Sequence, residues 1–146
     1  MLDSWKGVCI AMKLVVQTLN EHFSIGKLHD FSQVDLSGGL CFLGDTDEEK
    51  SLICPTEYVP DNVLVRDDGW RGMRIAGVLD FSLIGVLAEI STLLAQQQIG
   101  IFVVSTYNTD YIFVKEEHLT RATDTLTSAG FAVCPDSSPK AKPSIS

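Results

Sequence analysis

The stretch IFVVSTYNTDYIFV, residues 101–114, decides the fold. Its two ends, IFVVS and DYIFV, are rich in β-branched and aromatic residues, a composition typical of β-strands. The six residues between the apolar parts (105–110) all carry polar groups, and they include four hydroxyls and a final carboxylate. The stretch therefore predicts two strands joined by a short polar loop. Three roles are open to that loop: turning the chain, catalysis, or binding a ligand.

A strand and a helix are predicted before this pair of strands. WRGMRIAGV (residues 70–78) alternates, with Met73 and Ile75 on one face and Arg74 on the other, as a half-buried strand does. FSLIGVLAEISTLLAQQ (residues 81–97) repeats apolar residues at spacings of three and four, which predicts an amphipathic helix. Asp80 or Ser82 can cap the start of this helix, and Gly100 follows its end.

A second helix and a last strand are predicted after the pair. EEHLTRATDTLTSAG (residues 116–130) places Leu119, Ala122, Leu126 and Ala129 on one helical face. Its two glutamates lie at the favourable N-terminal end, and Gly130 lies at the C′ position. FAV (residues 131–133) then reads as a short strand. The order β-α-β-β-α-β predicts an α+β, ferredoxin-like fold with both helices on one face of an antiparallel sheet.

The N-terminal half indicates a smaller module that is rich in strands. Short strands are predicted in KLVVQTL (13–19), FSIGKL (23–28), LCFLGD (40–45) and SLICP (51–55). The first twenty residues also fit a helical stripe, so both alternatives stay open there. We therefore expect an N-terminal module (1–60), a linker (61–69), the βαββαβ module (70–134) and a disordered tail (135–146) with three prolines and four serines.

Composition excludes several classes of partner. The net charge is −8, and an acidic protein disfavours nucleic acid and anionic membrane surfaces. No apolar run reaches the ~18 residues of a membrane span, and we expect no signal peptide. The four cysteines are far apart without a C-x-x-C motif, which favours buried thiols over disulfides or a zinc site. We expect a cytoplasmic protein.

Motifs for catalysis are missing from the sequence. It has no G-x-S-x-G, no P-loop and no G-x-G-x-x-G, and its three histidines lack the spacing of metal ligands. Ser105 would be the nucleophile of a small hydrolase, but no sequence feature provides a general base beside it. We therefore expect no enzyme activity, no cofactor and no metal.

The polar loop is expected to lie next to the loop that follows the first strand. In a ferredoxin-like fold the first and third strands lie side by side, so the loop after the first strand (79–82) and the loop before the third (105–110) meet at one end of the sheet. The start of a helix offers unpaired N–H groups that bind a carboxylate, and Asp110 offers a carboxylate for an ammonium group. Gly85, one turn into the predicted helix, removes a side chain where a backbone or a ligand approaches. The two loops together favour a site for a free amino acid.

Residues 69–119 carry a family resemblance, which covers roughly residues 12–134. LDFSLIGVLA (residues 79–88) together with STYNTDYIFVK (residues 105–115) resembles the ACT-domain family of small regulatory modules that bind amino acids. The chain is similar to proteins with two tandem ACT-like modules, related to CASTOR-type amino-acid sensors and to the regulatory domains of aspartate kinases. TDEEKSLICPTEYVP (residues 46–60) is similar to the segment before the second module in such proteins.

The resemblance implies a non-catalytic regulatory or sensor protein that binds a small amino acid and self-associates as a homodimer. It implies that the ligand contacts the loop after the first strand and the start of the first helix, with the polar loop opposite. The implied ligand-binding residues are Asp80, Phe81, Ser82, Leu83, Ile84, Gly85, Ser105, Thr106, Tyr107 and Asp110. The alternative is a protein-interaction or dimerisation module without a metabolite. A polar pocket around Asp110 would favour the sensor, and a desolvated apolar surface would favour the interaction module. The protein that such a sensor regulates is not encoded in this chain.

Overall fold

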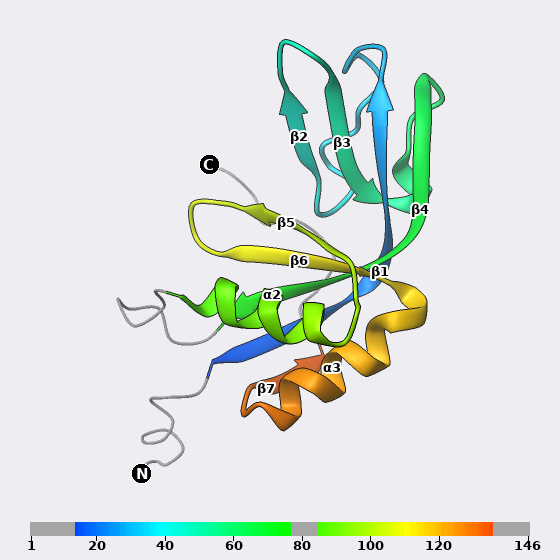
Figure 1. Cartoon of the computed structure of the whole chain (residues 1–146). Helices are drawn as coiled ribbons and strands as arrows, with labels where there is room; N and C mark the ends of the chain where they lie inside the picture. The colour runs from blue at the N-terminus through cyan, green and yellow to red at the C-terminus, as the bar shows by residue number, and fades with distance from the viewer. Residues whose placement is uncertain (1–13, 77–84, 136–146) are drawn as a thin grey trace. The chain divides into compact units, whose positions relative to one another are not determined.

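The computed structural model of the chain describes residues 14–76 and 85–135 (Figure 1). The described residues form strands, α-helices and short 3-10 helices (η). In order, they are β1 (Val15–Leu28), β2 (Phe42–Asp45), β3 (Lys50–Pro55), η1 (Thr56–Tyr58), β4 (Val63–Ala76), α2 (Val86–Gln96), β5 (Ile101–Ser105), β6 (Asp110–Lys115), η3 (Glu116–His118), α3 (Leu119–Ser128) and β7 (Ala132–Pro135).

These elements form two compact units. The helical unit comprises residues 14–20, 71–76 and 85–135, and the strand unit comprises residues 21–70. The strands β1 and β4 each contribute residues to both units, so neither unit is one continuous stretch of chain.

Two predictions about the N-terminal half are wrong. The segment 61–69, expected to be a linker, lies largely within β4, which begins at Val63. Residues 64–68 are all exposed, so they lack the apolar alternation that reveals a half-buried strand, but they still pair with β1. The strands expected at 13–19 and 23–28 are one strand, β1, because the polar residues between them continue the extended chain. The helical alternative fails for residues 15–20, and residues 1–13 lie outside the described part.

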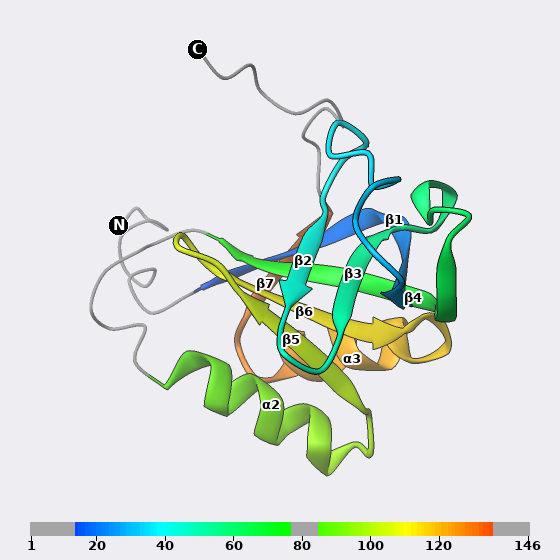
Figure 2. The same ribbon diagram turned by 90° about the horizontal axis from the view of Figure 1, so that it is seen from above.

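The helical unit confirms the predicted βαββαβ order, as β4-α2-β5-β6-α3-β7. Its strands lie in the order β7-β1-β4-β6-β5, so the first and third strands of the motif, β4 and β6, are neighbours. Figure 2 shows β5 and β6 side by side as an antiparallel hairpin, paired from Ile101↔Val114 to Ser105↔Asp110. The sheet is not purely antiparallel as expected. The apolar start of β1 adds a strand between β4 and β7, and it pairs in parallel with β7.

Both helices pack on one face of this sheet (Figure 1). The core between them is fully apolar, as the predicted stripes require. The buried residues of this core are Val16, Met73, Ile75, Ile90, Leu94, Ile99, Ile112, Val114, Ala122, Leu126 and Phe131. Arg74 lies on the opposite face from Met73 and Ile75, where its Nε and Nη2 donate to Gln17 Oε1 at 3.2 and 3.1 Å. Neither helix of the described residues is long and apolar enough to cross a membrane.

The start of α2 differs from the prediction. The helix begins at Val86, and Gly85 precedes it with φ of +87° as the N-cap residue, without a side-chain cap. Gly85 is therefore not one turn into a helix, and a Cβ placed on it would meet no atom of the described residues within 4 Å. Its role is conformational, because L-residues rarely adopt this backbone conformation. The expected caps, Asp80 and Ser82, lie outside the described residues.

Both helices end in the same hydrogen-bonded motif. In α3 the amide of Gly130 donates to Thr127 O and that of Phe131 to Leu126 O, both at 3.0 Å, and Gly130 has φ of +104°. This pair of hydrogen bonds is a Schellman motif, and it confirms Gly130 as the C′ residue. Ala129, expected on the buried face, is exposed because the helix ends one residue before it.

The end of α2 repeats this motif without a glycine. Gln98 N–H donates to Ala95 O at 2.9 Å and Ile99 N–H to Leu94 O at 3.0 Å, and Gln98 has φ of +60°. Gly100, expected to terminate the helix, lies two residues too late. Packing of Ile99 in the core holds Gln98 in the left-handed conformation despite its side chain.

Gln98→Gly is therefore expected to raise the free energy of unfolding by about 0.5–1 kcal/mol. Relief of the left-handed strain is partly offset by the larger backbone entropy of glycine in the unfolded chain. The reciprocal change, Gly130→Gln, should lower the free energy of unfolding by a similar amount. Urea unfolding measures both, and two changes of the same sign would contradict this account of the helix ends.

The strand unit has its own small core. Its strands lie in the order β2-β3-β1-β4, and β2 and β3 form an antiparallel hairpin from Phe42↔Ile53 to Asp45↔Lys50. The buried residues of the core are Leu28, Leu52 and Cys54, and the partly buried residues packed against them are Phe31, Val34, Cys41, Val59 and Val63. Residues 1–60 thus include the strands expected there, although β1 also serves the helical unit.

Candidate ligand-binding site

The polar loop between β5 and β6 is a tight turn held by its two threonines. Thr106 N–H and Thr106 Oγ1 both donate to Thr109 O, at 2.8 and 3.1 Å, and Thr109 N–H donates to Thr106 Oγ1 at 3.4 Å. Tyr107 and Asn108 form the exposed tip of the turn. Hydroxyls bonded to nearby backbone groups stabilise turns in this way. The loop is therefore an ordered structure that fixes where β6 begins.

Thr109 also ties the turn to the neighbouring strand. Its Oγ1 donates to the carbonyl oxygen of Ile75, one residue before the end of β4, at 2.5 Å. The next residue, Asp110, begins β6 and pairs with Ser105. The bond from Thr109 thus restrains the backbone at Asp110, from which the carboxylate extends, relative to the end of β4.

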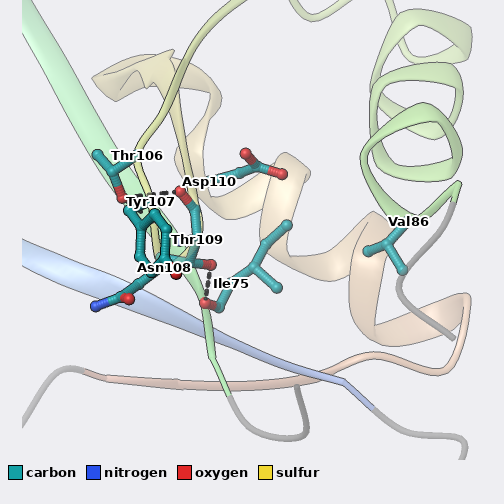
Figure 3. A pocket seen from close by; sticks show the side chains of 7 residues that line it. All are labelled: Ile75, Val86, Thr106, Tyr107, Asn108, Thr109 and Asp110. Atoms are coloured by element: carbon teal, nitrogen blue, oxygen red, sulfur yellow. Dashed lines mark hydrogen bonds between the residues drawn. The ribbon is translucent and has the colours of Figure 1, made fainter. Parts of the chain in front are cut away.

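A pocket of about 220 Å³ lies beside this turn (Figure 3). It is formed by the end of β4, the start of α2 and the polar loop. The lining residues are Ile75, Val86, Thr106, Tyr107, Asn108, Thr109 and Asp110. In Figure 3 the side chains of Ile75 and Asp110 lie between the loop and Val86, whereas Tyr107 and Asn108 lie on the far side of the loop from Val86. The pocket thus has an apolar wall and a polar wall.

The start of α2 provides hydrogen-bond donors on the apolar side. Glu89 N–H donates to Gly85 O at 2.9 Å, the first bond of the helix. The amides of Val86, Leu87 and Ala88 precede it, and a helix does not use its first amides for its own hydrogen bonds. These amides and the helix dipole favour an anionic group at this end.

The charges of the pocket suit a group of mixed polarity. Asp110 is half-buried and, among the lining residues that the structure describes, it is the one carboxylate and none is lysine or arginine. A half-buried carboxylate needs a hydrogen-bonded partner more than an exposed one does. In residues 14–76 and 85–135 no three His, Cys, Asp or Glu side chains gather as a metal site.

The structure brings together part of the predicted site. Thr106, Tyr107 and Asp110 line the pocket, and Gly85 directly precedes the lining residue Val86. Ser105 is exposed and is not part of the lining. The remaining predicted residues, Asp80, Phe81, Ser82, Leu83 and Ile84, lie outside the described residues.

Four lining residues were missed by the sequence reasoning. They are Ile75, Val86, Asn108 and Thr109. Asn108 and Thr109 belong to the polar run 105–110, whose other four residues were predicted to bind the ligand. The run as a whole therefore indicated the site better than the individual residues did. Ile75 and Val86 read as core residues, because a sequence pattern does not distinguish an apolar residue at the end of a core from one that lines a pocket.

Thr109→Val tests the bond that positions the loop. The change keeps the shape of the side chain and removes the hydroxyl that donates to Ile75, so we expect the free energy of unfolding to fall by about 1 kcal/mol. Thr120→Val, an exposed threonine in α3, is the matched control and should change it by less than about 0.5 kcal/mol. Chemical denaturation compares the two variants. Equal losses in the free energy of unfolding would show that the hydroxyl of Thr109 does not position the loop.

A second hollow lies along α2 and α3. It is larger, about 420 Å³, but it is a shallow groove. Its one basic residue, Arg121, already donates from Nη1 to Gln97 O at 3.3 Å. Because this groove is shallow and its one basic side chain already has a partner, the pocket beside Asp110 is the better candidate.

Comparison with known proteins agrees with this structure. Residues 65–128 match the sequence profile of the ACT domain. No curated protein shows significant similarity to the chain. ACT domains are regulatory modules that often bind amino acids.

Solved structures share the fold over most of the chain. A protein of Agobacterium tumefaciens is 28% identical with a TM-score of 0.77, over 86% of this chain and 96% of that one. The regulatory subunit of aspartate kinase from Thermus thermophilus, in its ligand-free form, is 11% identical with a TM-score of 0.56, over 78% and 95% of the two chains. Aspartate kinase from Clostridium acetobutylicum, an allosteric enzyme, is 10% identical with a TM-score of 0.58. That match covers 80% of this chain and only 33% of the kinase.

Three observations support the same fold. They are the order of the elements, the packing of both helices on one face of the sheet and the match to the ACT-domain profile. The chain has a mixed, sheet-rich α+β fold, and its residues 65–128 match the sequence profile of the ACT domain.

Proposed function

We propose that the chain is a non-catalytic sensor that binds a free amino acid in the pocket beside Asp110. The observation that carries this proposal is the convergence of a helix start, a strand end and an ordered polar loop on one small pocket. The ACT domain supports it, because such domains often bind amino acids. The expected cytoplasmic location remains a prediction.

The carboxylate of the ligand would bind at the start of α2. The amides of Val86, Leu87 and Ala88 offer hydrogen bonds there, and the helix dipole adds a partial positive charge. Glu89 lies in the first turn, but its side chain is exposed and solvent screens its charge. An amino acid can therefore dock its anionic end without a basic side chain.

The ammonium group of the ligand would bind Asp110. A charge-assisted hydrogen bond to a carboxylate is shorter and stronger than a neutral one. The turn around Thr109 holds the backbone that carries this carboxylate in place before the ligand arrives, which lowers the ordering cost of binding.

The size and polarity of the pocket favour a small metabolite over a protein partner. Its volume of about 220 Å³ is below the ~300–1,000 Å³ that drug-sized ligands occupy. Protein interfaces are much larger and have an apolar core. The lining around Asp110 is mainly polar, which favours the sensor over an interaction module without a ligand.

A thermal-shift screen tests this proposal. Each of the free amino acids is added in turn, and at ~100 times its dissociation constant the true ligand raises the free energy of unfolding by about 2.7 kcal/mol. We expect a shift with one amino acid or a few of similar chemistry. A chain that no amino acid stabilises would be an interaction module instead.

The sensor is expected to self-associate. ACT-like modules commonly pair, so we predict a homodimer with about twice the 16.0 kDa mass of one chain. Multi-angle light scattering at micromolar concentration measures this mass. A single species with the mass of one chain, with and without ligand, would rule out the dimer.

A further inference from the structure

Two cysteines of the strand unit lie opposite each other beside the β2–β3 hairpin. The hairpin pairs Phe42 with Ile53, and the same register continued by one residue places Cys41 opposite Cys54. The chain before β2 still follows β3 at this point, because a Cβ on Gly39 would lie 3.5 Å from Pro55 Cγ. The two cysteines are therefore cross-strand neighbours, although they are far apart in the sequence.

The hydrogen-bond pattern gives the type of this pair. At the turn, Thr46 N–H donates to Glu49 O at 2.9 Å, so this pair is of the hydrogen-bonded type. Pair types alternate along an antiparallel ladder, which makes Phe42↔Ile53 hydrogen-bonded and the next pair, Cys41 and Cys54, non-hydrogen-bonded. In such pairs the Cα atoms are ~4.5 Å apart and the side chains are closest. This separation lies within the ~4.4–6.8 Å that disulfides span.

The packing of the two side chains agrees with the register. Cys54 is 3% exposed in the core with Leu28 and Leu52, and Cys41 packs against this core. Burial raises the pKa of Cys54 to about 12, and the charge of Cys41 adds to this effect. An electrostatic effect of one thiol on the other requires that they lie close together.

We propose that Cys41 and Cys54 are a redox-active pair, reduced in this structure, that forms a reversible intramolecular disulfide with a small disulfide oxidant such as glutathione disulfide. This inference does not depend on the amino-acid site, because all of its residues belong to the strand unit.

The reaction takes two exchange steps. Cys41, the more exposed thiol, attacks as the thiolate and forms a mixed disulfide with one glutathione, and the other glutathione leaves as a thiolate. This removes the negative charge of Cys41, so ionisation of Cys54 becomes easier. The Cys54 thiolate then attacks the sulfur of Cys41, and the second glutathione leaves. Two electrons pass from the protein to glutathione disulfide, and the two protons of the thiols end on two glutathione molecules.

The experiment uses the full chain with Cys9→Ser and Cys134→Ser, so that only the pair remains. The protein is equilibrated in buffers with increasing ratios of oxidised to reduced glutathione, quenched with a maleimide in denaturant so that the buried Cys54 also reacts if it is reduced, and weighed by mass spectrometry. We expect both thiols to become protected together, with the loss of two hydrogens and no bound glutathione. A linked peptide containing Cys41 and Cys54 should appear after digestion, and reductant should reverse the change.

Single variants test the order of the steps. Cys54→Ser in the same background should gain one glutathione at Cys41, whereas Cys41→Ser should stay unmodified because Cys54 is buried and poorly ionised. Peptide mapping of the unsubstituted chain gives the same test without any change that could disturb folding. Two thiols that still react with maleimide at the most oxidising ratio would overturn the proposal. A product that holds only glutathione, or only an intermolecular link, would overturn it as well.

Discussion

Asp110→Asn is expected to weaken binding of the amino-acid ligand by about ten- to a hundredfold. Asp110 is the carboxylate that lines the pocket, and a hydrogen bond to a charged group contributes roughly 1.5–3 kcal/mol. Asparagine keeps the shape of the side chain and the turn preferences of the loop, so the bonds of Thr109 should survive. Calorimetric titration of the parent and the variant measures the ratio of dissociation constants.

Glu117→Gln is the matched control for this change. It removes the same charge from an exposed position in η3, which is not part of the pocket lining, so the dissociation constant should stay within about twofold. If Asp110 only shapes the turn, both variants would bind with the affinity of the parent. Equal affinities would therefore remove Asp110 from the site.

Gly85→Val should have the second largest effect, a loss of about 1–3 kcal/mol in the free energy of unfolding. Gly85 has φ of +87°, a conformation that a β-branched residue adopts only under strain. The expected cause is this strain, because a Cβ at this position meets no atom of the described residues within 4 Å. If the chain relieves the strain by moving the start of α2, the lining residue Val86 and the first amides of the helix move too, and ligand affinity falls with stability.

Gly100→Val is the control for Gly85→Val. It separates the effect of the backbone conformation from the effect of adding a side chain. A Cβ on Gly100 also meets nothing within 4 Å, but its φ lies outside the left-handed range. We expect its effect on stability to stay within about 0.5 kcal/mol, and ligand binding to be unchanged. Urea unfolding with and without ligand measures both variants. Similar results for Gly85→Val and Gly100→Val would show that the backbone conformation at Gly85 does not matter.

The sequence predicted the helical unit well because its periodic patterns have one simple cause. The apolar stripes of α2 and α3 and the alternation around Met73 and Ile75 all face one core, and local sequence records this directly. Gly130 was recognised as a helix terminator because glycine favours a positive φ. Gln98 was missed at the equivalent place in α2, because there the packing of Ile99 overrides the preference of the residue.

The strand unit was harder to predict because long-range pairing determines it. The exposed residues 64–68 carry no apolar pattern, and only the pairing of β4 with β1 makes them a strand. The place of β1 between β4 and β7 depends on contacts between residues over a hundred positions apart, such as Val15↔Ala132. Such contacts leave no periodic signal within either segment.

Only part of the candidate site could be predicted from the sequence, because topology places its elements but not the contacts of single side chains. The topology argument placed the loop before β6 and the start of α2 at one end of the sheet, and both line one pocket. It did not identify Thr109 as the residue that ties the loop to Ile75, because hydroxyls in a polar run look alike in sequence.

The central claim is that the pocket beside Asp110 binds a free amino acid, and an NMR titration of the ¹⁵N-labelled chain tests it most directly. A mixture of the free amino acids is added to the protein, and amide shifts are followed residue by residue. We predict that the largest shifts fall on the loop from Thr106 to Asp110 and on Val86, Leu87 and Ala88. A spectrum that the mixture leaves unchanged, or shifts confined to residues outside this pocket, would contradict the account.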